Sequence, residues 1–164
     1  FSTLHTNSAA GTFPRLIDLG VNPKVISSAV NLALAQRLVR VLCAKCKTAV
    51  PLEGAERERA ERLVKKLSAM GISAAQTKEH YVPSASGCLL CGGTGFSGRI
   101  GIFEAVLMDE NVDAVVRANP SEGEIEKAAL PQGLPTMAED GYLKMLAGLT
   151  SLEELERVVD TSGM

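Results

Sequence analysis

The chain has 164 residues with a formal net charge of −2, and 46% of its residues are hydrophobic. This length and apolar content are enough for one domain or two small ones. A pI near 5.8, 4% aromatic residues and the absence of tryptophan argue against a general nucleic-acid binder and against a base-stacking surface. No apolar run has the length of a membrane span, and no targeting signal opens the chain, so we expect a cytoplasmic protein.

The first segment, residues 1–5, predicts the end of a buried strand. A strand that opens a chain without an initiator methionine suggests an excised piece of a larger protein. Asn7 or Ser8 is expected to cap the helix that follows, and Gly20 to end it in the left-handed conformation. Pro14 removes a backbone donor within that helix, so we expect a kink or a restart there.

Asn22-Pro23 combines a capping residue with proline at the first helical position, which predicts a second helix.

Two strands are predicted further along the chain. Residues 34–42 fit both a helical and an alternating pattern, and we prefer a strand for the second half because it leads directly into a cysteine pair. Residues 98–107 are apolar and β-branched, which predicts a strand. The two strands would pair antiparallel as stems of a hairpin that carries a long insertion.

The chain contains four cysteines in two Cys-x-x-Cys pairs: Cys43 with Cys46, and Cys88 with Cys91. Two such turns can supply the four thiolates of a tetrahedral zinc site, and a complete set leaves no open position for a water or substrate. The sequence therefore predicts structural Zn²⁺ at these residues. Disulfides or free thiols are the alternative, although the chain does not resemble a small secreted disulfide scaffold.

The spacer between the cysteine pairs, residues 47–87, is longer than in a common zinc ribbon and is expected to hold structure of its own. Residues 53–70 predict a helix with a narrow apolar stripe that includes Leu63 and Leu67. Gly71 is expected to end this helix. Its many charged residues indicate a solvated outer face.

From Asp109 onward the sequence predicts short helices that must pack on one another, because such helices are unstable alone. Their starts carry capping signals, in which side chains satisfy the free N–H groups of the first turn. The signals are Ser121 with Glu124, Thr136 with Glu139, and the Thr150-Ser151 pair before Leu152.

Several ordered motifs together resemble one known family. The motifs are Ser-Thr-Leu-His-Thr-Asn at 2–7, Leu-Ala-Gln-Arg-Leu-Val-Arg at 34–40, the two cysteine pairs, Gly-Phe-Ser-Gly-Arg-Ile-Gly-Ile-Phe-Glu at 95–104, and Thr-Ser-Leu-Glu-Glu-Leu at 150–155. In this order they resemble the C-terminal part of the ATPases of bacterial type II secretion and type IV pilus assembly. The resemblance runs nearly from end to end of the chain.

The resemblance implies an α/β fragment with three parts. Residues 1–42 would form the end of a RecA-like ATPase domain, residues 43–96 an inserted tetracysteine zinc-binding module, and residues 97–164 a returning strand with a helical C-terminal extension. Proteins of this family are homohexameric ATPases at the cytoplasmic face of the bacterial inner membrane. Their partners would be the inner-membrane platform proteins of the secretion or pilus system.

The resemblance also implies a catalytic role for His5, which matches the family's His box near the γ-phosphate of ATP. The sequence contains no Gly-x-x-x-x-Gly-Lys-[Ser/Thr] phosphate-binding motif. ATP and Mg²⁺ would therefore be bound only by the full-length parent, and we expect the isolated chain to be inactive. Taken without the resemblance, His5 is equally a structural histidine. Arg37 and Arg40 could reach a phosphate or a neighbouring subunit, but we interpret them as surface ion-pairing residues.

Two other classes of function remain open from the residues alone. One is a zinc-stabilised protein-interaction module without a catalytic role. The other is a zinc-ribbon nucleic-acid binder, which the acidic balance of the chain disfavours.

Overall fold

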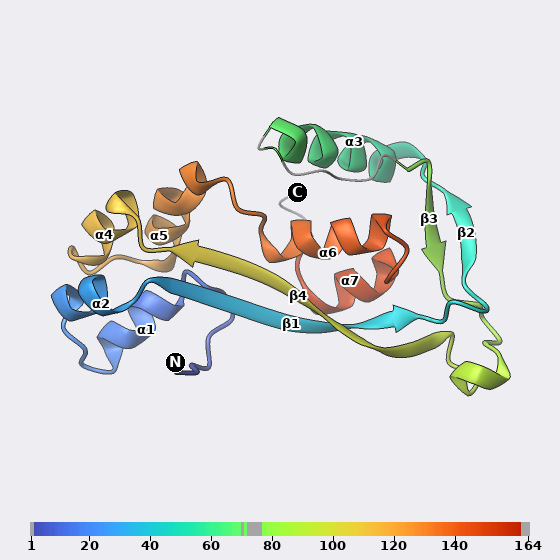
Figure 1. Cartoon of the computed structure of the whole chain (residues 1–164), viewed down its shortest axis with the longest axis horizontal. Coiled ribbons are helices and arrows are strands. Elements are labelled where there is room, and N and C mark those ends of the chain that lie inside the picture. Colours follow the sequence, from blue (N-terminus) through green and yellow to red (C-terminus); the bar gives the residue numbers. More distant parts are fainter. Residues whose placement is uncertain (1, 70, 72–76, 162–164) are drawn as a thin grey trace. The chain divides into compact units, whose positions relative to one another are not determined.

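A computed structural model describes residues 2–69, 71 and 77–161 as a mixed α/β chain. Its contacts divide the chain into two compact units. The first unit combines Phe1–Gln36 with Phe103–Thr136, and the second combines Arg37–Ile102 with Met137–Met164. The two long strands β1 (Leu32–Leu42) and β4 (Phe96–Leu107) each contribute residues to both units (Figure 1).

The first unit packs four short helices on a small apolar core. These helices are α1 (Thr12–Asp18), α2 (Pro23–Ala29), α4 (Glu110–Val116) and α5 (Glu122–Ala129), and a 3-10 turn, η2 (Leu130–Gln132), follows them. Each helix contributes at least one side chain that is at most 1% exposed: Phe13, Ile26, Val112, Val116 and Ile125. The helices stabilise one another through this shared core, because helices this short are unstable alone. Of the helices predicted after Asp109, only α4 and α5 share this core, since α6 and α7 belong to the second unit.

The predicted strand at residues 1–5 is wrong for the residues that the structure describes. Residues 2–6 have no regular secondary structure, and Phe1 lies outside the described part. A strand is stable only beside a hydrogen-bonded neighbour, whereas here Thr6 donates its hydroxyl locally to the carbonyl of Ser8 at 3.1 Å. The apolar and β-branched residue types alone did not reveal whether a partner strand was available.

Helix α1 shows no break at Pro14, because the helix begins at Thr12 and places the proline in its first turn. A proline there sacrifices no helical hydrogen bond. The N-cap is Gly11 rather than Asn7 or Ser8, although the Ser8 hydroxyl accepts the N–H of Gly11 at 3.0 Å. The end of the helix is as predicted, with Gly20 at a φ of +86°.

Helix α2 confirms the Asn22-Pro23 start. Asn22 is the N-cap, its side chain accepts the N–H of Lys24 at 2.9 Å, and Pro23 is the first helical residue.

Strands β1 and β4 form a two-stranded sheet, which confirms the predicted hairpin stems. At one end the N–H of Met108 donates to the carbonyl of Asn31 at 3.0 Å. At the other end the N–H of Cys43 donates to the carbonyl of Gly95 at 2.9 Å. Because the later residue of one strand faces the earlier residue of the other, the pairing is antiparallel (Figure 1).

The second unit contains a further strand pair that the sequence did not predict. Strand β2 (Thr48–Pro51) pairs antiparallel with β3 (Glu79–Val82), with Thr48 opposite Val82 and Pro51 opposite Glu79. Helix α3 (Gly54–Ala69) lies between the two strands in sequence. The long spacer between the cysteine pairs is thus a strand-helix-strand segment.

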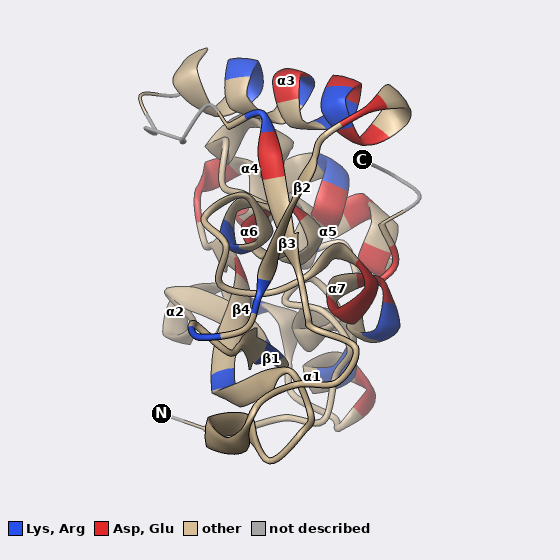
Figure 2. Ribbon diagram, turned by 90° about the vertical axis from the view of Figure 1, so that its right-hand side faces the viewer, with Lys and Arg blue, Asp and Glu red and all other residues tan. Residues whose placement is uncertain are grey.

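Helix α3 confirms the predicted spacer helix, with Met70 outside the described residues. Its buried stripe contains Leu63 and Leu67, as predicted, and also Ala60 and Val64. Acidic and basic residues alternate along the ribbon of this helix (Figure 2).

Helices α6 (Met137–Leu146) and α7 (Leu152–Val158) complete the second unit. Tyr142, fully buried on α6, donates its hydroxyl to the carbonyl of Glu56 on α3 at 2.8 Å. Lys66 on α3 donates to the carboxylate of Glu139 on α6 at 2.6 Å. These two polar contacts join α3 to α6.

The predicted caps at Ser121 and Ser151 are confirmed. Ser121 and Glu124 form the reciprocal capping box, and the Ser151 hydroxyl accepts the N–H of Glu154 at 3.2 Å. Helix α6 begins directly after Thr136.

Candidate metal centre

The four cysteine sulfurs converge in the second unit. Cys43 and Cys46 follow β1, while Cys88 is the N-cap and Cys91 the last residue of the 3-10 turn η1 (Leu89–Cys91). The Sγ atoms of Cys43 and Cys88 lie 3.8 Å apart, those of Cys46 and Cys91 also 3.8 Å, and those of Cys88 and Cys91 3.7 Å. All four sulfurs lie within 4.8 Å of one another.

This spacing fits a four-coordinate ion. A tetrahedral centre with metal–sulfur bonds of about 2.3 Å places its sulfurs about 3.8 Å apart. Cys43 and Cys91 are buried, and Cys46 and Cys88 are half-buried, so the donor set is shielded from water on part of its surface. The four thiols can therefore hold one metal ion.

Backbone N–H groups donate hydrogen bonds to one of the four sulfurs. The Sγ of Cys91 accepts the N–H of Cys88 at 3.1 Å and that of Gly95 at 3.3 Å. The N–H of Cys88 is the main cause that lowers the pKa of the Cys91 thiol to about 6, whereas burial first and neighbouring thiols second raise the pKa of Cys46 to about 12. The backbone hydrogen bonds thus favour the thiolate of Cys91, and the thiolate is the form that a metal ion binds.

Gly87 allows the close turn around the second cysteine pair. Its φ is +59°, and a Cβ at this position would lie 2.3 Å from the carbonyl carbon of Gly93. Gly92 has the same φ of +59° but has no atom within 4 Å of its Cβ position. Substitutions at the two glycines therefore share the cost of a left-handed backbone, but only a substitution at Gly87 adds the cost of a steric overlap.

We expect Gly87→Ala to lower the free energy of unfolding by about 2 kcal/mol more than Gly92→Ala, because only the first substitution adds an overlap with backbone. Both substitutions lose about 1–2 kcal/mol from the left-handed conformation. Urea denaturation of the two variants measures the difference. Equal losses would contradict the close approach of residues 87 and 93.

A buried carboxylate that the sequence did not single out binds the strand that leads into Cys43. The Glu154 side chain is 0% exposed and binds Arg40 of β1 and Arg157 of α7. Arg40 donates to it from Nε at 2.9 Å, from NH2 at 2.6 Å and from its backbone N–H at 3.0 Å. Arg40 is thus an ion-pairing residue, as predicted, but its partner is buried.

The same segment satisfies the backbone of β1 along one edge. The Thr150 hydroxyl donates to the carbonyl of Arg40 at 2.9 Å, and the N–H of Leu42 donates to the carbonyl of Leu149 at 2.9 Å. The motif at residues 150–155 therefore joins the C-terminal helix to the strand that leads into Cys43. The sequence signal was the motif itself, but it did not distinguish Glu154 from Glu153.

His5, the predicted catalytic residue, is exposed and belongs to the first unit. Arg37 is also exposed, on β1. His80, which the resemblance did not include, is half-buried on β3. The structure therefore brings the four cysteines together but does not join His5 to them in one unit.

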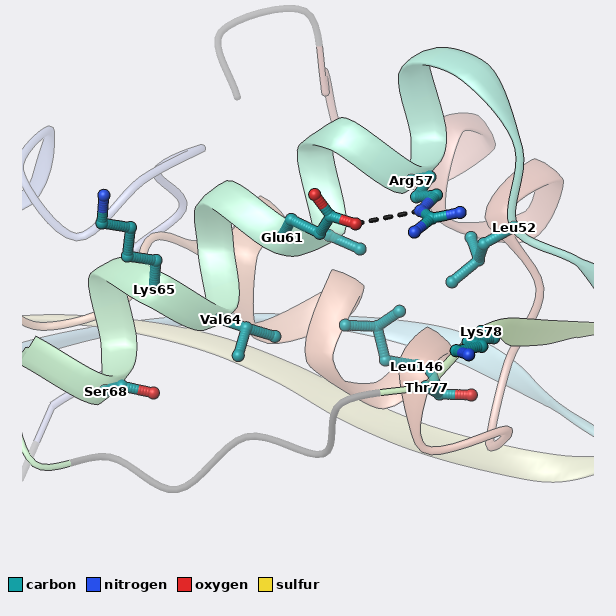
Figure 3. Close-up of a pocket in the computed structure, with 10 residues that line it drawn as sticks. Leu52, Arg57, Glu61, Val64, Lys65, Ser68, Thr77, Lys78 and Leu146 are labelled. Atoms are coloured by element: carbon teal, nitrogen blue, oxygen red, sulfur yellow. Dashed lines mark hydrogen bonds and ion pairs between the residues drawn. The ribbon is translucent and has the colours of Figure 1, made fainter.

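A groove lies along helix α3 in the second unit (Figure 3). Its volume is about 660 Å³, and its apolar wall includes Leu52, Val64 and Leu146. Arg57 and Glu61, ion-paired at 2.9 Å, lie on its rim. The composition is that of a surface groove rather than of a metal site.

Among the residues that the structure describes, none of the helices combines the length and the apolar character needed to cross a membrane.

Comparison with known proteins identifies the family. The family described as "Type II/IV secretion system protein" matches residues 1–157. The type IV pilus assembly ATPase PilB of Thermus thermophilus is 38% identical over 94% of the chain, and the type II secretion system protein E of Pseudomonas aeruginosa is 40% identical over 96%. The type II secretion system ATPase E of Vibrio cholerae is 37% identical over 98%. The chain spans 16%, 29% and 29% of the lengths of these relatives, and it belongs to the type II/IV secretion system protein family.

Proposed function

We propose that the chain forms the C-terminal portion of an ATPase that powers type II secretion or type IV pilus assembly. The family match over residues 1–157 carries this proposal, and relatives at 37–40% identity bear both kinds of name. The intact protein would be a homohexamer in the cytoplasm, docked on inner-membrane platform proteins. Residues 1–42 would complete its RecA-like domain, residues 43–96 its zinc module, and residues 97–164 its helical extension.

Zn²⁺ is the ion that we assign to Cys43, Cys46, Cys88 and Cys91. Four thiolate donors at tetrahedral spacing support this choice, because zinc favours sulfur ligands and four-coordination in structural sites. When bound, the ion would neutralise thiolate charge and fix the two turns to each other. The cysteines would fill its coordination shell, so its role would be structural.

His5 is the residue of this chain that we propose for the nucleotide site of the intact protein. An exposed imidazole is free to donate to a phosphate oxygen or to an attacking water. ATP and Mg²⁺ would be held by residues elsewhere in the parent. The isolated chain is therefore expected to show no ATP turnover.

We expect His5→Ala in the full-length protein to lower the ATPase rate by roughly 10²-fold, the usual effect of losing one donor to transition-state charge. Phosphate release by the assembled protein measures the rate. His80→Gln is the matched control, since it alters the other histidine of the chain, in a different unit, and should leave the rate within about twofold.

A normal rate in His5→Ala, with the control also normal, would contradict the catalytic assignment. It would favour the second candidate, a zinc-stabilised protein-interaction module without a catalytic role. The observation behind this candidate is that the clustered cysteines and His5 belong to different units.

A further inference from the structure

We propose that the metal centre and helix α7 are energetically coupled through Phe96, Arg40 and Glu154, so that metal binding strengthens the docking of α7. The inference rests on the proposed metal site. It assigns Arg40 a positioning role between that site and the C-terminal helix.

On the metal side, Gly95 is the connecting residue. Its N–H donates to the Sγ of Cys91 at 3.3 Å, and its carbonyl accepts the N–H of Cys43 at 2.9 Å. Gly95 therefore touches one cysteine of each pair. Loss of the ion would release both cysteines and, with them, the position of this peptide.

The next residue carries the effect to Arg40. The guanidinium carbon of Arg40 lies 4.0 Å from the centre of the Phe96 ring. Stacking on an aromatic face fixes the plane of a guanidinium and is favourable in itself. Arg40 also lies on β1 shortly before Cys43 in the sequence. The ring contact with Phe96 and the chain from Cys43 therefore both connect the metal centre to this arginine.

On the helix side, Arg40 meets the buried carboxylate of Glu154. A planar guanidinium donates two hydrogen bonds to a carboxylate only in a narrow range of orientations, and here both Nε and NH2 donate to the same carboxylate oxygen, Oε2. Glu154 lies on α7 and is also bound by Arg157 at 2.7 Å. A shift of Phe96 would misalign Arg40 and weaken this attachment.

Coupling of this kind is reciprocal, because each event changes the free energy of the other by the same amount. Metal binding should lower the equilibrium constant for opening of α7, and docking of α7 should raise metal affinity by the same factor. Substitution of a residue with a purely structural role would lower the free energy of unfolding without changing α7 opening and zinc affinity by the same factor.

The test compares zinc-loaded and chelator-stripped full-length protein by hydrogen exchange, with zinc content measured by elemental analysis. Stripping should accelerate exchange in residues 152–158 by about tenfold or more, since such coupling reaches at least this size, and leave α5 in the first unit unchanged. In Arg40→Lys and in Phe96→Leu, the ratio of the exchange rates in stripped and zinc-loaded protein should fall towards one. Arg57→Lys is the control, since Arg57 forms an exposed ion pair in the same unit.

The effect of α7 docking on zinc affinity is measured by competition for Zn²⁺ with a chromogenic chelator. Arg40→Lys, Phe96→Leu and Glu154→Gln should weaken zinc affinity by the factor seen in exchange, and Arg57→Lys should not. Stoichiometric zinc with unchanged exchange in α7 would overturn the coupling alone. Protein that binds no zinc would overturn both the coupling and the proposed metal site.

Discussion

Replacing Cys88 with serine is expected to remove the metal and to destabilise the second unit by on the order of 5 kcal/mol or more. The reason is that binding free energy in a structural thiolate site is also folding free energy, and such sites contribute more than almost any single side-chain contact. Three remaining sulfurs would leave the ion with an open position. Elemental analysis and thermal denaturation of the same preparation measure the two losses together.

Leu89→Ser is the matched control for this substitution. It introduces the same residue one position later, at a side chain that is 101% exposed. The control should keep one zinc ion per chain and its melting temperature. Unchanged zinc content in Cys88→Ser would contradict a site that needs all four cysteines.

Glu154→Gln is expected to lower the free energy of unfolding by about 3 kcal/mol at neutral pH, because the variant loses the charge-assisted hydrogen bonds that Arg40 and Arg157 donate to the buried carboxylate. Burial alone would raise the pKa of Glu154, but hydrogen bonds from Arg157 and Arg40 outweigh it and lower the pKa from 4.5 to about 2. Since the folded-state pKa lies below the unfolded-state value, this contribution is complete above pH 4.5 and is lost as the pH falls towards 2.

Denaturation between pH 7 and pH 3 measures this dependence as the difference between wild type and variant. The difference should be constant above about pH 5 and should shrink on acidification. Glu153→Gln, an exposed neighbour on the same helix, controls for the loss of a charge and should change the unfolding free energy by less than about 0.5 kcal/mol. A difference that persists undiminished at pH 3 would show that the charge of Glu154 is not what stabilises the fold.

The parts of the fold that were predicted correctly depend on local chemistry. Asn22-Pro23 and Ser121 each predict the start of a helix from a few neighbouring residues. The buried stripe with Leu63 and Leu67 follows from helical geometry alone. The four cysteines were also predictable as a group, because their spacing in each pair already places two sulfurs on one turn.

The parts that were missed depend on distant neighbours. Strand β2 ends in Pro51 and pairs with a strand beyond a whole helix, so no short window of sequence indicates the pairing. Glu153 and Glu154 are the same residue type on one helix, and only the position of Arg40 on β1 decides which is buried. Residues 2–6 failed as a strand for the same reason, since strand formation requires a partner.

The attachment of residues 149–154 to β1 has a consequence for self-association. The exposed edge of a strand can add a strand from another molecule and so seed polymers. At Arg40 and Leu42 that edge is occupied by Leu149, Thr150 and Glu154. A chain cut before residue 149 would leave these groups of β1 without their partners, and we expect such a chain to aggregate more readily.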